Sequence, residues 1–183
     1  FKIDEEFTKK LVGEDPDIFI DESAFMGEHS VEVQLPFLQS VLKDFKIVPV
    51  VIGDCSMATC KKIAAIFKEV IGSRNDVLVV VSTDLYHGYD ILEADKVDTL
   101  TLELIKKMDA EGLYYALRDA KAQACGGVGT VIGLNLVKEM GADKVEVLNQ
   151  TNSALVTGET ANGQWTVGYA SIAFYNTKGE DML

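Results

Sequence analysis

The sequence predicts an α/β protein with a largely parallel central sheet flanked by helices. Short apolar runs typical of buried strands alternate with longer segments whose apolar residues recur at helical spacing. The run at residues 77–81 is continuous and rich in valine, as expected for a strand covered on both faces. The chain has 183 residues, 48% of them hydrophobic. That is enough for one sizeable core, so we expect a single domain over residues 1–183.

The first third of the chain predicts short strands and two helices. Residues 1–4 have the character of a strand, residues 5–12 of a short helix, and residues 18–20 of a brief strand. A helix is expected over residues 30–43, because four apolar residues recur there at helical spacing: Val31, Leu35, Leu38 and Leu42. Pro36 fits only near the first turns of this helix.

The middle third predicts two strands around one amphipathic helix. Residues 47–52 are β-branched, and Pro49 suggests an edge or irregular position. Residues 57–71 predict a helix with one apolar face, made of Ile63, Ile66, Phe67 and Val70. The valine-rich strand at 77–81 follows.

The last part predicts three helices and two strands. A long helix is expected over 91–107, a second helix from about residue 109, and a third over 127–140, which Gly141 ends. Residues 145–148 and 165–175 predict strands. In the second, alternate residues would face opposite sides, with Val167, Tyr169, Ser171 and Ala173 on one side. The intervening segment 149–164 is rich in Asn, Thr, Gly and Ser and predicts a loop.

Charge and composition exclude several classes of partner. The formal net charge is -12 and no basic run exists, which argues against nucleic acid and against an anionic membrane surface. The longest purely apolar stretch has about five residues, far too short to span a bilayer. Three cysteines do not form a disulfide framework, and no signal peptide is visible. We therefore expect a cytoplasmic protein. Because the sequence opens at Phe1 with strand character, we also expect further residues of the domain to precede it.

Two histidines lie in short polar segments between apolar ones. His87 closes a segment that starts at Ser82 and includes Asp84, directly after the strongest predicted strand. Open α/β sheets place their chemistry beyond the carboxyl ends of strands, so Asp84 and His87 are candidate cavity residues. A capping loop is the alternative. His29 lies at the start of a predicted helix, where Glu32 could orient its imidazole. An exposed, capped histidine is the alternative there.

Cys125 precedes a glycine-rich helix start, where the helix dipole and free amides favour a thiolate. A small buried side chain in a close-packed helix is the alternative. Cys55 and Cys60 are five residues apart, which would place them on different faces of a helix, so we interpret them as ordinary thiols rather than a zinc site. The glycines at 126–129 lack the Lys-Ser/Thr of a phosphate-binding loop, and no Gly-x-Ser-x-Gly hydrolase motif surrounds either Ser30 or Ser82.

Three motifs together resemble the Memo family, whose bacterial and archaeal members are called AmmeMemoRadiSam system protein B. They are Glu-His-Ser-Val-Glu-Val-Gln-Leu-Pro-Phe-Leu at 28–38, Ser-Thr-Asp-Leu-Tyr-His at 82–87 and Ala-Cys-Gly-Gly at 124–127. Their order and the final Gly-Tyr-Ala strand at 168–170 also fit, so the resemblance covers nearly the whole chain. It implies the fold of class III extradiol ring-cleaving dioxygenases, a LigB-like fold, here truncated at its N-terminal side.

The resemblance also implies a site. His29 and Cys125 correspond to two of the family's three metal ligands, and Asp84 and His87 to cavity residues that could be catalytic. The third ligand of the family is a histidine in a His-Ala-Gly-Tyr type motif, which this sequence lacks. The implied cofactor is a transition metal, iron or copper, and a cysteine in place of a carboxylate shifts the preference toward copper or a redox role. By association, an AMMECR1-type protein and a radical SAM enzyme are implied partners.

Three functions follow as hypotheses. The first is a Memo-like metal-binding protein with a His/Cys site. The second is an active extradiol-type dioxygenase or other oxidoreductase, with His87 as its acid/base residue. The third is a non-catalytic module that binds a peptide or a small acid.

Overall fold

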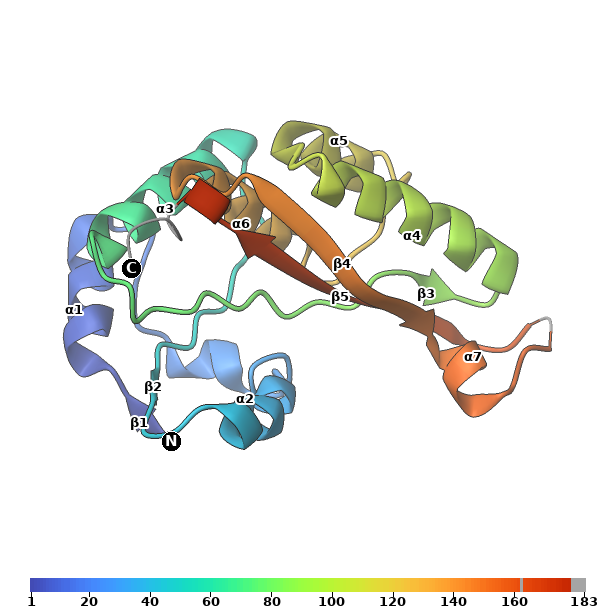
Figure 1. Cartoon of the computed structure of the whole chain (residues 1–183), viewed down its shortest axis with the longest axis horizontal. Coiled ribbons are helices and arrows are strands. Elements are labelled where there is room, and N and C mark those ends of the chain that lie inside the picture. Colours follow the sequence, from blue (N-terminus) through green and yellow to red (C-terminus); the bar gives the residue numbers. More distant parts are fainter. Residues whose placement is uncertain (162, 179–183) are drawn as a thin grey trace.

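The computed structural model describes residues 1–161 and 163–178 and shows a mixed α/β chain with small sheets (Figure 1). The N-terminal part contains the strand β1 (Lys2–Ile3), the helix α1 (Glu5–Glu14), the short 3-10 helices η1 (Glu22–Phe25) and η2 (Glu32–Gln34), the helix α2 (Leu35–Val41) and the strand β2 (Lys46–Ile47). The remaining elements are α3 (Met57–Ile71), β3 (His87–Gly88), α4 (Ile91–Lys106), α5 (Ala110–Arg118), α6 (Gly127–Glu139), β4 (Lys144–Asn152), α7 (Ser153–Thr157) and β5 (Thr166–Tyr175).

The longer helices begin where a polar side chain caps them. Ser56 precedes α3, and its hydroxyl accepts the Thr59 N–H at 3.1 Å. Asp90 precedes α4 and accepts the N–H groups of Leu92 and Glu93. Each cap satisfies amides that the helix itself leaves without a partner. The predicted helix over 57–71 is confirmed at both ends, and the long helix predicted from 91 ends within one residue of the expected position.

The hydrophobic core lies between α1, α3, α5 and α6, with a contribution from the end of α4. Its largest fully buried side chains include Leu113 of α5 and Leu134 and Leu136 of α6. Burial of a leucine contributes about 1.5–3 kcal/mol relative to an exposed one. This cluster of helices therefore forms the stable part of the molecule, against which the remaining segments are placed.

The main sheet is antiparallel. β4 and β5 form a long ribbon that crosses the molecule in Figure 1, and β3 pairs with the beginning of β5, with His87 opposite Val167. The only parallel pair in the described part of the chain joins β1 to β2, with Lys2 opposite Lys46. The mixed α/β prediction is thus confirmed. The large parallel sheet expected from the sequence is not formed by residues 1–161 and 163–178.

Two segments that were expected to be strands of the parallel sheet form no strand among the described residues. Residues 77–81 have no strand assignment, and Leu78 and Val80 are 67% and 46% exposed. Residues 48–52 follow β2 but also remain outside any sheet. A strand is stabilised by neighbouring strands rather than by its own residues. The sequence therefore predicted correctly that these segments are apolar and extended. The prediction that they pair with neighbouring strands is wrong for the described residues. The brief strand expected at 18–20 is also absent.

The prediction of a loop over 149–164 is wrong for residues 149–157, which belong to a strand and a helix. β4 continues to Asn152 after an irregularity between Val147 and Asn149, and α7 follows at once. Asn152 caps α7, because its side-chain oxygen accepts the Leu155 N–H at 2.9 Å. Asn and Ser are favoured at such caps as well as in loops, so composition alone did not separate the two. Residue 162 of this predicted loop lies outside the described residues.

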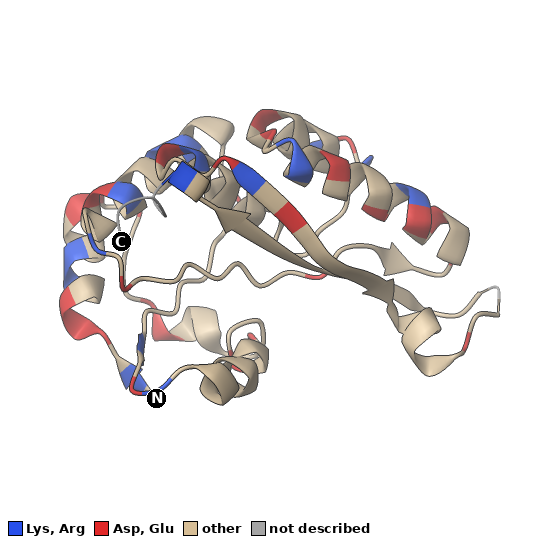
Figure 2. Ribbon diagram, in the orientation of Figure 1, with Lys and Arg blue, Asp and Glu red and all other residues tan. Residues whose placement is uncertain are grey.

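Charged side chains are concentrated on the helices, whereas the central extended segments carry few of them (Figure 2). In the part of the chain that the structure describes, none of the helices combines the length and the apolar character needed to cross a bilayer.

Candidate functional site

The candidate site forms where the loop after residues 77–81 meets the start of α6. α6 begins with glycines and has no capping side chain of its own. Thr83 of the loop supplies one, because its hydroxyl oxygen accepts the Gly126 N–H at 2.8 Å and its hydroxyl donates to the Asp84 carbonyl at 2.8 Å. The loop and the helix start are therefore held in one arrangement, although they are more than 40 residues apart in sequence.

Cys125 lies directly at this junction. Its N–H donates to the Asp84 carbonyl at 3.0 Å, and the Asp84 N–H donates to the Cys125 Sγ at 3.1 Å. The Thr83 hydroxyl lies 3.6 Å from the same sulfur. The backbone of Asp84 therefore holds Cys125 through two hydrogen bonds. The alternative of a small buried side chain in a close-packed helix is wrong for this residue, because Cys125 is exposed.

His87 approaches the same loop from β3. Its Nδ1 lies 3.1 Å from the Leu85 carbonyl oxygen and its Nε2 3.7 Å from Asp84 Oδ2. A carbonyl oxygen can only accept, so Nδ1 carries the hydrogen of this contact. In the neutral ring Nε2 then holds the lone pair and faces Asp84. This arrangement can take up or release a proton at Nε2.

Aromatic side chains border His87. The Trp165 ring centroid is 6.2 Å from that of His87, and Tyr89 meets Trp165 edge-on at 4.9 Å. Burial raises the pKa of Tyr169, and the negative charge of Asp84 raises it further. The site thus combines an imidazole, a carboxylate and a thiol with an aromatic border.

His29 makes no direct contact with the other candidate residues in the described part of the chain. Its Nδ1 lies 2.6 Å from Glu32 Oε1, so the expected orienting contact is present, but the side chain of His29 is 73% exposed. The Gln34 amide donates to the Ser82 hydroxyl at 2.9 Å, which ties the segment that carries His29 to the loop of the site. In the described residues, no hydrogen bond or ion pair joins His29 to Cys125, Asp84 or His87.

The family resemblance implies a transition metal, and the residues present fit one only in part. Thiolate and imidazole are suitable donors for iron or copper. Among residues 1–161 and 163–178, however, no group of three or more His, Cys, Asp or Glu side chains is arranged to hold a metal ion. The described residues by themselves therefore do not make a complete metal site.

Asp98 is a buried acid beside the site that sequence reasoning missed. It is 3% exposed, and its Oδ1 accepts the Tyr86 N–H at 2.9 Å. Burial raises the pKa of Asp98, and this hydrogen bond only partly offsets that effect. The sequence did contain a signal, because Asp98 lies between Ala94 and Leu102 on the buried face of α4.

The prediction that Cys55 and Cys60 lie on different faces of a helix is wrong. Their Sγ atoms are 3.4 Å apart, because Cys55 precedes α3 instead of lying on it. Cys60 is fully buried, and burial raises its pKa to about 12, with a contribution from the contact with Cys55. All three cysteines of the chain are free thiols.

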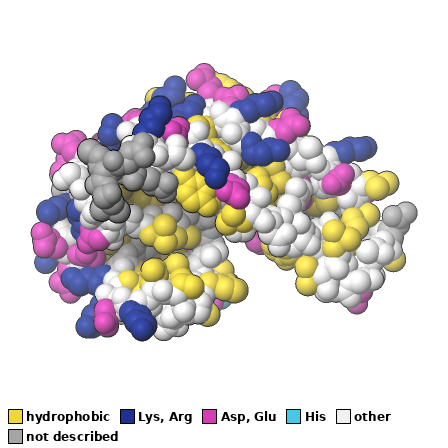
Figure 3. Space-filling view, viewed as in Figure 1, with side chains coloured by type: hydrophobic (Ala, Val, Ile, Leu, Met, Phe, Trp, Pro, Cys, Tyr) yellow, Lys and Arg dark blue, Asp and Glu magenta, His cyan; other side chains and the backbone are white. Residues whose placement is uncertain are grey.

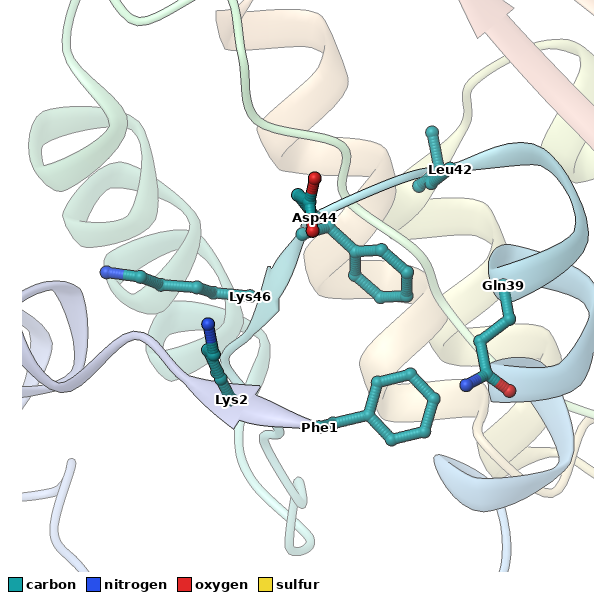
Figure 4. A pocket seen from close by; sticks show the side chains of 7 residues that line it. Phe1, Lys2, Gln39, Leu42, Asp44 and Lys46 are labelled. Atoms are coloured by element: carbon teal, nitrogen blue, oxygen red, sulfur yellow. The ribbon is translucent and has the colours of Figure 1, made fainter.

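The candidate site lies beside one surface hollow and apart from a second. A hollow of about 290 Å³ lies next to Cys125, and its lining includes Gln123, Arg118 and Asp54. Arg118 is ion-paired with Asp54 at 2.7 Å, so its charge is already matched. A larger hollow of about 570 Å³ lies elsewhere, beside β1 and β2, where Phe1, Lys2 and Lys46 line it (Figure 4). Only the smaller hollow contains a residue of the candidate site.

Comparisons with known proteins agree with the resemblance seen in the sequence. The sequence profile of the family described as Memo-like protein matches residues 1–173. A MEMO1 family protein of Nitrosopumilus maritimus is 34% identical over 173 residues, which are 94% of this chain and 62% of the relative. A MEMO1 family protein of Caldivirga maquilingensis is 35% identical over 175 residues, 95% of this chain and 61% of the relative. One from Thermotoga neapolitana is 39% identical over 151 residues, 82% of this chain and 52% of the relative. The chain thus spans between about half and three-fifths of the length of these curated relatives.

Proposed function

The chain belongs to the Memo-like protein family, and from this premise we propose that it is a metal-binding protein in which His29 and Cys125 supply two ligands for iron or copper. The observation that supports the proposal is the setting of Cys125, an exposed residue whose sulfur accepts the Asp84 N–H at 3.1 Å. Hydrogen-bonded groups around a ligand orient it and tune its donor strength. The Gln34–Ser82 contact, which brings the His29 segment to the same loop, adds support.

The proposal requires a further donor, since the described residues contain no group of three. We place that donor in polypeptide of the kind that the relatives carry outside the matched region, within a LigB-like sheet and cavity. A bound iron or copper ion would supply Lewis acidity or redox chemistry at the site. The role of this chain's residues is to hold the sulfur, orient the His29 ring through Glu32, and exchange a proton at His87 Nε2.

Equilibrium dialysis against Fe(II) without oxygen, and separately against Cu(I), tests the proposal. We expect Cys125→Ser and His29→Ala each to weaken binding by about 10-fold or more, in line with the usual loss of a ligand or of its support. Cys55→Ser is the matched control, because it removes a thiol outside the site and should leave binding unchanged. Equal affinity of the wild type and the Cys125→Ser, His29→Ala double variant would exclude the site.

A second candidate function is ring cleavage or another oxidation, with His87 as the acid/base residue. The geometry that favours it is the pairing of Nδ1 with the Leu85 carbonyl, which leaves Nε2 facing Asp84. Oxygen uptake with a panel of catechols after iron loading tests this function. His87→Asn should abolish uptake while leaving iron binding intact, because Asn retains a donor near Nδ1 and lacks a basic nitrogen. A complete absence of uptake leaves metal binding as the function.

The implied partners are also proposals. An AMMECR1-type protein and a radical SAM enzyme would be recovered with the tagged protein from cells that encode all three. Recovery of neither would remove this part of the proposal.

A further inference from the structure

The thiols of Cys55 and Cys60 meet at the start of α3. Ser56 caps this helix, so Cys55 is the residue before the cap and Cys60 is the fourth residue of the helix. Side chains at these two positions often pack against each other, where they fix the angle at which the chain enters the helix. The two Sγ atoms are 3.4 Å apart. The contact therefore follows from the way the chain enters α3.

Cys60 is held in place by the hydrophobic core. It is fully buried and belongs to the cluster of apolar side chains between α1, α3, α5 and α6. Other apolar side chains are open to solvent, as Figure 3 shows between the α1–α3 side of the molecule and the part that carries α2. Burial and the contact with Cys55 raise the pKa of the Cys60 thiol to about 12. Cys60 thus keeps its proton in the reduced protein and has a fixed position beside Cys55.

Cys55 lies in a loop whose backbone is held by α5. Its carbonyl oxygen accepts the Tyr114 hydroxyl at 3.2 Å and the Arg118 guanidinium at 3.4 Å. Cys55 is half-buried, whereas Cys60 is fully buried. Of the two thiols, Cys55 is therefore the one that a small reagent can reach. The chain thus places one accessible thiol and one protected thiol in contact.

We propose that Cys55 and Cys60 form a dithiol site that a small-molecule disulfide, such as oxidised glutathione, reversibly oxidises to a protein disulfide. The Cys55 thiol loses its proton, and its sulfur attacks the reagent to form a mixed disulfide and release one small thiol. The Cys60 thiol then loses its proton, and its sulfur attacks the Cys55 sulfur, which forms the protein disulfide and releases the second small thiol. The protein loses two electrons and two protons, and the reagent gains them.

Closure of the disulfide requires little movement. An S–S bond is about 2.05 Å long, and the sulfur atoms start from a distance of 3.4 Å. Because the core holds Cys60, the movement falls on Cys55 in the loop. Asp54, the residue before Cys55, lines the hollow of about 290 Å³ that also contains Cys125. The disulfide would therefore link one border of this hollow to α3, and the proposal does not depend on metal binding.

Peptide mapping after oxidation tests the proposal. The protein is incubated with oxidised glutathione, and its free thiols are then alkylated in urea. Trypsin cleaves after Lys46 and Lys61, so one peptide carries both Cys55 and Cys60, whereas Cys125 lies in another peptide. We expect the first peptide to escape alkylation, to be lighter by two hydrogen atoms, and to become alkylated again after treatment with dithiothreitol. Two alkylated cysteines in it, or glutathione that remains on Cys55, would overturn the proposal.

The unfolded chain separates a redox site from a mere packing contact. A fold that accommodates the S–S bond favours its closure, so the equilibrium constant of the reaction with glutathione should be about 10-fold or more larger in the folded protein than in urea. If the contact serves packing alone, closure strains the start of α3. An equal or smaller constant in the folded protein would then be found, and it would overturn the proposal.

Three variants test the assigned order of the two sulfur atoms. In Cys60→Ala no second sulfur displaces the reagent, so glutathione should remain on Cys55. In Cys55→Ser the buried Cys60 should carry no glutathione, and an adduct on it would overturn the assignment of Cys55 as the attacking thiol. Cys125→Ser is the matched control, because it removes the third thiol and should leave closure between Cys55 and Cys60 unchanged. Loss of closure in this control would also overturn the proposal.

Discussion

Asp84 and Cys125 are joined by two hydrogen bonds of opposite direction. The Cys125 N–H donates to the Asp84 carbonyl at 3.0 Å, and the Asp84 N–H donates to the Cys125 sulfur at 3.1 Å. The second bond places the sulfur by a backbone group, which cannot rotate away as a side chain can. The position of the proposed ligand is thus a property of the fold, set by the loop after residues 77–81 and the start of α6.

Substitution of Cys125 should separate the structural role of the sulfur from its chemical role. Cys125→Ser retains an acceptor for the Asp84 N–H, so we expect a urea midpoint close to that of the wild type. Cys125→Val has a similar shape but leaves this N–H without a protein partner, so its midpoint should be lower. Urea denaturation followed by circular dichroism measures both, and a lower midpoint for serine than for valine would contradict the account.

Gly168 should tolerate no side chain. A methyl group there would overlap the Asp98 carboxylate, and both residues are buried. We expect Gly168→Ala to destabilise the protein by about 1–3 kcal/mol, as overpacking usually does. Gly53→Ala is the control, because a methyl group at Gly53 meets nothing within 4 Å. Asp98→Ala should relieve part of the cost in the double variant, and strict additivity of the two changes would show that the overlap is not the cause.

The Asp98 carboxyl should make stability depend on pH. Burial raises its pKa above the ordinary value of 3.8, so the folded protein holds this proton where the unfolded chain has lost it. The contribution of Asp98 is therefore most favourable below pH 3.8 and is lost as the pH rises through the raised pKa.

The amide of Asp98→Asn cannot ionise but can still accept the Tyr86 N–H. We expect its stability relative to the wild type to improve as the pH rises from about 4 to 7, measured by urea midpoints. Glu103→Gln on the same helix is exposed and should show no such trend. A constant difference between Asp98→Asn and the wild type over this range would contradict the assigned shift.

The three thiols should differ in reactivity. Burial raises the pKa of Cys60 to about 12 and excludes solvent from it, whereas Cys125 is exposed. We expect iodoacetamide at pH 8 to label Cys125 well before Cys60 in the folded protein, as peptide mass spectrometry would show. Both should react at similar rates in urea. Early labelling of Cys60 without unfolding would contradict its assigned environment.

Sequence patterns predicted those elements whose stability is local. The helix over 57–71 has a capping serine and a continuous apolar face, and it was predicted at both ends. The strand over 165–175 was predicted to within one residue because its alternation reflects a half-buried ribbon. Residues 77–81 were predicted as the best strand and form none among the described residues, because a strand is stabilised by neighbouring strands and not by its own residues alone.

The part of the candidate site that depends on local structure was also predicted from the sequence. Asp84, His87 and Cys125 lie at element boundaries, and the structure brings them together through local turns and one helix start. No hydrogen bond or ion pair among the described residues joins His29 to Cys125, and local patterns do not determine how two segments so far apart in sequence are arranged. Asp98 and the Cys55–Cys60 contact arise from packing, so spacing along the chain gave only indirect signals.

The central claim is that His29 and Cys125 ligate one metal ion, and X-ray absorption spectroscopy of the copper-loaded protein tests it most directly. We expect both sulfur and imidazole neighbours at copper in the wild type, loss of the sulfur in Cys125→Ser, and a reduced imidazole signal in His29→Ala. A sulfur neighbour that persists in Cys125→Ser, or an imidazole signal unchanged in His29→Ala, would contradict the claim.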